Sequence, residues 1–130
     1  MKRRPLIIDT DPGVDDAIAI LLALASPELD LLGICAVAGN VPLAATQDNA
    51  RRICELAGRP DIPVYAGCPR PMLREQIFGK YSGVSGLGGT LLPPPSMPLM
   101  RVPTRIAGSR VSLILKVTHM SLMSRIATTG

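Results

Sequence analysis

Residues 6–25 decide the fold of this chain, and they read LIIDTDPGVDDAIAILLALA. The first three residues are aliphatic and an aspartate follows them, a pattern typical of a buried strand in a parallel sheet. Residues 17–25 contain only alanine, isoleucine and leucine, which favours a helix that is covered on most sides. The stretch therefore predicts a strand, a turn and a helix, the opening unit of an α/β fold.

The alternation of strands and helices continues along the chain. Further elements are predicted as a strand at 29–37, a helix at 42–57 and a strand at 62–66. We therefore expect a Rossmann-like parallel sheet, reduced to its first β-α-β-α-β units. Ligands of such sheets bind beyond the carboxyl ends of the strands, where Asp9, Asp11 and Asn40 fall.

Composition limits the class of protein. A length of 130 residues suits one domain, and the longest apolar run, 17–25, is shorter than the roughly 20 residues of a membrane span. The three cysteines lack the spacing of a zinc site or a disulfide framework. The three aromatic residues offer no stacking platform for single-stranded nucleic acid. We expect a cytoplasmic protein that binds neither membrane nor nucleic acid.

Charge is divided unevenly between the two halves of the chain. All ten acidic residues lie in 1–75, whereas 76–130 contain six Lys or Arg and no acid. Residues 100–130 follow neither a clean helical nor a clean strand period, so the sequence predicts no element there. We expect residues 1–99 to be one part of a domain and residues 100–130 to be an atypical basic tail. Out-of-frame translation would produce such an abrupt change.

Four carboxylates lie within eight residues, at Asp9, Asp11, Asp15 and Asp16. Pro12-Gly13 suits the centre of a type II turn, in which the glycine has a positive φ, and such a turn would bring Asp11 toward Asp15 or Asp16. Two charges about 4 Å apart repel by about 4 kcal/mol at an effective dielectric near 20, and a helix N-terminus offsets only about 0.3–1 kcal/mol. A divalent cation is therefore expected, and oxygen-only ligands favour calcium or magnesium over zinc.

Other interpretations of the same residues stay open. Asp15 could cap the helix and Asp16 could support its dipole, with the other two aspartates solvated. An Asp9-x-Asp11 pair after a strand also resembles the nucleophile and acid of haloacid-dehalogenase-like phosphatases, which leaves Asp15 and Asp16 unexplained. An EF-hand is excluded, because its loop would need an acidic ligand where Ile20 stands.

The octet from Asp9 to Asp16 closely resembles the N-terminal signature of the inosine-uridine preferring nucleoside hydrolases. The resemblance continues, in family order, through residues 31–34, 37–41, 49–50, 63–67 and 85–89. Together these blocks cover residues 1–99, which resemble the opening portion of a longer family chain.

The resemblance implies that the protein hydrolyses the N-glycosidic bond of ribonucleosides and releases free base and ribose. It also implies that this reaction depends on Ca²⁺. By similarity, Asp11 and Asp16 would ligate the ion, and Asp11 would also take a proton from the attacking water. Asp15 and Asn40 would hydrogen-bond ribose hydroxyls, and Asp9 would support its neighbours. The family resemblance further implies a homo-oligomer for the full-length protein.

Three departures from the family pattern weaken that expectation for this chain. Ser82-Gly83 stands where the family has a His-Gly pair, and an aspartate and a histidine that complete the family's site lie far beyond residue 130. Similarity also ends near Leu99. We therefore expect a truncated, weakly active or inactive form, with residues 86–89 as a flexible flap at the mouth of the pocket. The alternative is a non-catalytic gene product, or an interaction module whose basic tail binds an anionic surface.

Overall fold

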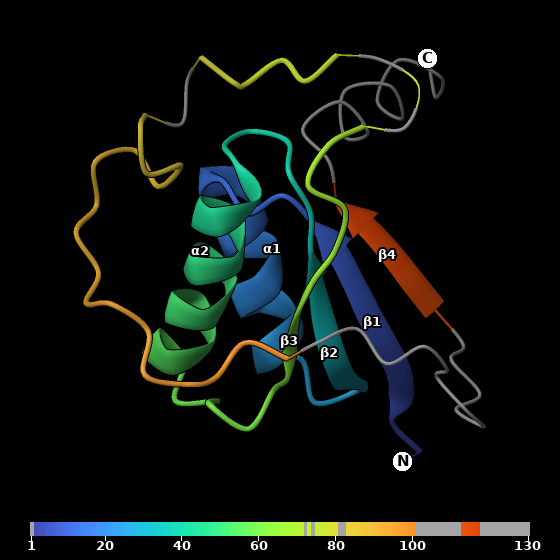
Figure 1. Cartoon of the computed structure of the whole chain (residues 1–130). Coiled ribbons are helices and arrows are strands. Elements are labelled where there is room, and N and C mark those ends of the chain that lie inside the picture. The colour runs from blue at the N-terminus through green and yellow to red at the C-terminus, as the bar shows by residue number, and fades with distance from the viewer. Residues whose placement is uncertain (1, 72, 74, 81–82, 101–112, 118–130) are drawn as a thin grey trace, which may run out of the picture.

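The computed structural model describes residues 2–71, 73, 75–80, 83–100 and 113–117. In chain order its elements are β1 (Arg4–Thr10), α1 (Val14–Ala25), β2 (Leu29–Ala36), α2 (Leu43–Leu56), β3 (Val64–Ala66) and β4 (Leu113–Val117). The strands form one parallel sheet in the order β3-β2-β1-β4, and both helices lie on the same face of it (Figure 1). The predicted α/β fold and its β-α-β-α-β order are confirmed.

Strand β4 lies in the segment for which the sequence predicts no element. It runs parallel to β1, from Leu6 opposite Leu113 to Thr10 opposite Val117. Pairing with the open edge of β1 gives this short segment a structure that its own periodicity does not reveal. The remainder of the segment, 101–112 and 118–130, lies outside the described residues, so the division of the chain at residue 99 stays a prediction.

The core lies between the sheet and the two helices. Side chains alternate between the faces of a strand, and Leu6, Ile8 and Thr10 of β1 are buried on the helix side. Ile34 of β2 and Val64 of β3 lie next to one another in the same layer, and both are fully buried. The helices complete the core with Ile20, Ala23, Ala50, Ile53 and Cys54.

Helix α1 is apolar on a second face as well. Val14, Ile18 and Leu22, four residues apart, form an apolar ridge, in which Ile18 is 63% and Leu22 is 68% exposed. The expectation that this helix is covered on most sides is wrong for the described part of the chain, because one sheet and one neighbouring helix cover only one side of it. No helix in the described residues is long and apolar enough to span a membrane.

We expect the apolar ridge to drive self-association, because clustered exposed apolar side chains favour contact between molecules. Replacing Ile18 and Leu22 together by glutamate keeps helix propensity and should shift the protein toward monomer mass in size-exclusion chromatography with light scattering. A matched control replaces Leu56 and Ile77, which are similarly exposed elsewhere, and adds the same charge. If the control shifts the mass as much as the ridge variant, the ridge is not the cause.

The three cysteines differ in their access to solvent, and all are free thiols. Burial raises the pKa of the Cys54 thiol to about 12, and the charge of Asp61 adds to this. Burial also raises the pKa of Cys35, whereas Cys68 is exposed. Because the thiolate is the reactive form, an aromatic disulfide reagent at pH 8 should modify Cys68 first and Cys54 only after unfolding. Rapid modification of Cys54 in a folded Cys68→Ser variant would contradict this prediction.

Candidate functional site

The carboxyl ends of β1 and β2 lie side by side and carry the polar residues of the site. The N–H of Val37 donates to the carbonyl of Thr10 at 2.9 Å, which continues the pairing of these strands beyond their last residues. The chain after β1 turns into α1, and the chain after β2 turns toward α2. Asp11 and Asn40, 29 residues apart in sequence, are therefore neighbours, and both are buried.

Asp16 occupies the third position of α1 and is 2% exposed. Its Oδ1 accepts a hydrogen bond from the Thr10 hydroxyl at 2.8 Å, and its Oδ2 accepts one from the N–H of Gly13 at 3.1 Å. An acidic side chain that bonds back to the N-cap residue is half of a capping box. The start of the helix therefore holds the carboxylate of Asp16 against the end of β1.

The turn that precedes α1 differs from the predicted type II turn. Gly13 has a φ of −105° and a ψ of −161°, which is extended backbone rather than the positive φ of that turn. Gly13 is the N-cap of α1, and N-cap residues take extended dihedral angles. The turn nevertheless brings Asp11 and Asp16 together, because the helix begins at the next residue.

Asn40 connects the two buried carboxylates. Its backbone N–H donates to Oδ2 of Asp11 at 2.8 Å, and its Nδ2 donates to the Asp11 carbonyl at 3.2 Å and to Oδ2 of Asp16 at 3.4 Å. The preceding residue, Gly39, has no room for a side chain, since a Cβ there would lie 2.1 Å from Oδ2 of Asp11. Close approach of the two turns therefore requires glycine at position 39.

The other two aspartates do not converge on this point. Asp15 is exposed on α1, although its charge contributes to raising the pKa of Asp16. Asp9 stands opposite Cys35 in the sheet register, on the face away from Thr10, because adjacent strand residues point to opposite faces. Its Oδ1 is buried and has no hydrogen-bond partner among the described residues. The structure thus brings together Asp11, Asp16 and Asn40, with Asp15 nearby and Asp9 apart.

The electrostatics of the pair fit one side of a cation site. Burial raises the pKa of Asp16 above its usual value, against the hydrogen bonds from Gly13 and Thr10 that lower it, and a neighbouring cation would lower this pKa further. Carboxylate oxygens are among the ligands that Ca²⁺ prefers, but it takes six to eight oxygen ligands in all, which also include carbonyls and water. Across the described part of the chain, no group of three or more His, Cys, Asp or Glu is placed to hold a metal ion.

A buried residue to which the sequence assigned no role lies beneath this turn. Asn49 of α2 is 1% exposed, and its Nδ2 donates to the carbonyls of Pro12 at 3.2 Å and Ser85 at 2.6 Å. The signal that could have revealed it is a polar side chain on the buried face of an amphipathic helix, one position before Ala50. Within residues 86–89, which the sequence predicts to be a flexible flap, Gly86 and Leu87 are buried and Leu87 belongs to the core, whereas Gly88 and Gly89 are exposed.

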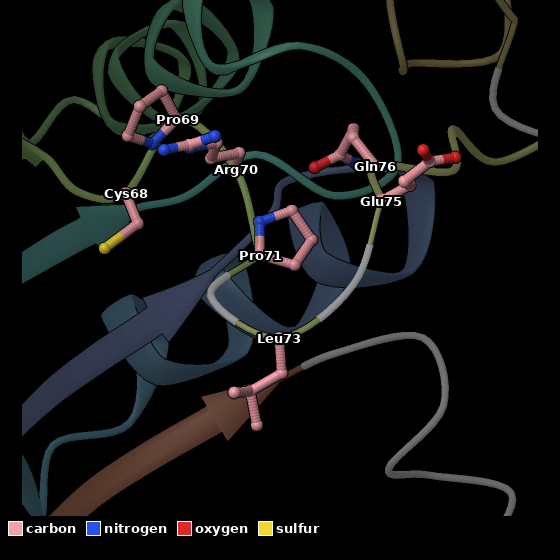
Figure 2. A pocket seen from close by; sticks show the side chains of 7 residues that line it. All are labelled: Cys68, Pro69, Arg70, Pro71, Leu73, Glu75 and Gln76. Atoms are coloured by element: carbon pink, nitrogen blue, oxygen red, sulfur yellow. The ribbon is translucent and has the colours of Figure 1, made fainter.

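A second loop, which includes Gln76 and Gly79, contacts the site at Gly39 and Asn40. The side chain of Gln76 donates to the carbonyl of Gly39 at 3.0 Å, and the N–H of Gly79 donates to the carbonyl of Asn40 at 2.9 Å. The same segment of the chain lines a pocket of ≈ 790 Å³, and Figure 2 shows the side chains that line it. The pocket is lined by Cys68, Pro69, Arg70, Pro71, Leu73, Glu75 and Gln76. Gln76 is therefore common to the pocket and to the contacts around Asn40.

Comparison with known proteins identifies this arrangement. Residues 6–127 match the family model of the inosine-uridine preferring nucleoside hydrolases. The chain belongs to this nucleoside hydrolase family. An uncharacterized protein of Schizosaccharomyces pombe is 60% identical over 92 residues, which are 70% of this chain and 30% of that protein. The pyrimidine-specific ribonucleoside hydrolase RihA of Photobacterium profundum is 51% identical over 94 residues, which are 72% of this chain and 30% of RihA.

Solved nucleoside hydrolase structures share the fold. The purine-preferring ribonucleoside hydrolase of Gardnerella vaginalis superposes with a TM-score of 0.69 at 34% identity, covering 75% of this chain and 32% of that one. The chain thus spans about 30% of the length of the relatives that it matches. Family membership decides against the haloacid-dehalogenase alternative. The names of the relatives include both pyrimidine and purine preferences, so they do not assign a base to this nucleoside hydrolase chain.

Proposed function

We propose that this chain carries the part of a ribonucleoside hydrolase that binds Ca²⁺ and ribose, and that it acts in the hydrolysis of the N-glycosidic bond to free base and ribose. One observation carries the proposal. Two buried carboxylates, Asp11 and Asp16, are joined by Asn40 at the carboxyl ends of β1 and β2, where open α/β sheets bind their ligands. We further propose a cytoplasmic location and a homo-oligomer for the complete family protein.

In this proposal Asp11 and Asp16 would hold the ion, which when bound would make an attacking water easier to deprotonate. Asp11 would accept the proton from the attacking water, and the 2.8 Å hydrogen bond from the N–H of Asn40 keeps its carboxylate in place. Positive charge develops on the sugar ring as the bond to the base breaks. The acidic turn stabilises that charge, because fixed negative groups are already oriented toward the site.

Hydroxyl groups of the ribose are assigned to Asp15 and Asn40. The exposed position of Asp15 on the first turn of α1 leaves its carboxylate accessible to a ligand. The side chain of Asn40 contacts both carboxylate-bearing residues, so a ribose bound by Asn40 would also lie beside Asp11. Asp9 takes a supporting role through the end of β1, at a distance from the ligand.

Ribose release from inosine and uridine, measured with and without a calcium chelator, tests the proposal. We expect slow release that is lost on chelation and in Asp11→Asn. Asp30→Asn is the matched control, because it removes the same charge at the half-exposed start of β2, and it should retain the activity. Calcium binding without ribose release would favour the alternative of a non-catalytic product. If the chain shows neither calcium binding nor ribose release, the proposal is overturned.

A further inference from the structure

Asn49 holds two segments that are far apart in sequence through one amide nitrogen. Its Nδ2 carries two N–H bonds, and each one is used: one for the carbonyl of Pro12, 37 residues away, and one for the carbonyl of Ser85, 36 residues away. Both partners are carbonyl oxygens, which only accept, so the orientation of the amide is fixed. Neither segment can leave without exposing a buried N–H that has lost its acceptor, which is costly.

The two segments are also packed against each other at this point. A Cβ on Gly86 would lie 3.0 Å from Nδ2 of Asn49, 3.1 Å from Cγ2 of Val41 and 3.4 Å from the carbonyl of Pro12. Leu87, the next residue, is buried in the core. Contact between the glycine segment and the turn is therefore close enough that a single methyl group would disturb it.

Pro12 lies in the middle of the turn that carries the two carboxylates. Of the neighbouring backbone groups in this turn, the carbonyl of Asp11 accepts from Asn40 and the N–H of Gly13 donates to Asp16. The third backbone group, the carbonyl of Pro12 between them, accepts its hydrogen bond from Asn49. Asn49 therefore fixes the part of the turn that Asn40 and Asp16 do not reach.

We propose that Asn49 is a positioning residue that couples residues 85–89 to the carboxylate turn at residues 11–16, so that docking of the first sets the geometry of the second. The consequence for cation affinity rests on the proposed function, whereas the coupling itself does not. Outer partners that orient metal ligands typically change metal affinity by about 10- to 100-fold when removed.

Hydrogen exchange by mass spectrometry and calcium calorimetry on the full 130-residue chain test the coupling. Asn49→Leu removes both donors at similar volume. Thr46→Val is its control, because Thr46 is equally buried one turn earlier on α2 and bonds only within that helix. We expect faster exchange at both 85–90 and 11–16 and an approximately tenfold or greater rise in the calcium Kd for Asn49→Leu. Thr46→Val should change neither, at a matched melting temperature.

A glycine pair keeps the test decisive if Asn49→Leu fails to fold. Gly86 and Gly89 both have positive φ, 84° and 83°, but a Cβ on Gly89 would meet nothing within 4 Å. Gly86→Ala should therefore show the same faster hydrogen exchange at residues 11–16 that is expected for Asn49→Leu, and Gly89→Ala should not. Unchanged exchange at 11–16 in Gly86→Ala would overturn the coupling. Absence of calcium binding by the unmodified chain would instead overturn the proposed function, and the exchange data would still decide the coupling.

Discussion

Replacing Ile34 by alanine is expected to lower the free energy of unfolding by about 2–5 kcal/mol, as large-to-small substitutions in well-packed cores do. Ile34 is fully buried in β2, opposite Ile8 of β1 and Val64 of β3, which are also fully buried. The cavity would lie at the centre of the helix-facing layer, where strands on both sides limit collapse. Because small domains are stable by only about 5–15 kcal/mol, this change alone should remove a large share of the stability of the chain.

Urea unfolding followed by circular dichroism measures this effect. Ile18→Ala is the matched control, since it is the same substitution on the exposed ridge of α1, and surface changes usually stay within about 0.5 kcal/mol. Equal losses for the two variants would mean that the layer around Ile34 does not form as described.

Replacing Asp16 by asparagine is expected to raise the calcium Kd by more than about 100-fold, because loss of a direct ligand should exceed the effect of losing an outer partner. The change removes one of the two buried carboxylates and one negative charge. It also places an amide group among the donors of Thr10, Gly13 and Asn40. Because the amide nitrogen cannot accept their hydrogen bonds, the free energy of unfolding should also fall by about 1–3 kcal/mol. Burial raises the pKa of Asp16, and removal of a desolvated charge offsets part of that loss.

Calorimetric titration with Ca²⁺ at neutral pH gives the affinity, and thermal unfolding gives the stability. Asp30→Asn removes an equal charge from a half-exposed position at the start of β2 and should leave the calcium affinity unchanged. Equal weakening in both variants would point to the net charge of the chain, rather than a site at Asp16, as the source of binding.

Much of the fold was predictable because it depends on local patterns. The apolar runs at residues 6–8 and 29–37 and the amphipathic stretch at 42–57 each specify their element without knowledge of the others. Strand β4 was not predictable in this way. Its five residues become a strand through pairing with β1, a contact more than 100 residues away in sequence.

The proximity of residues in the candidate site was predictable where the ends of parallel strands decide it. Asp11 and Asn40 were both expected at the carboxyl ends of the strands, and in the structure they are hydrogen-bonded to each other there. The sequence alone did not show that the Asp9 side chain lies away from Asp11 and Asn40. Its direction depends on which face of the sheet the helices cover. The role of Asn49 was hidden for the same reason, as its two partners are 37 and 36 residues away.

By itself, the sequence determined the family, the order of the elements and the edge of the sheet at which the acidic turn lies, because these follow from periodicity and from residues adjacent in the chain. Only the tertiary structure decided which carboxylates are buried together, what fastens the turn to the segment at 85–89, and that one face of α1 is left apolar and exposed. Those features arise from contacts between distant segments, and their energies depend on burial and hydrogen-bond geometry that no local pattern encodes.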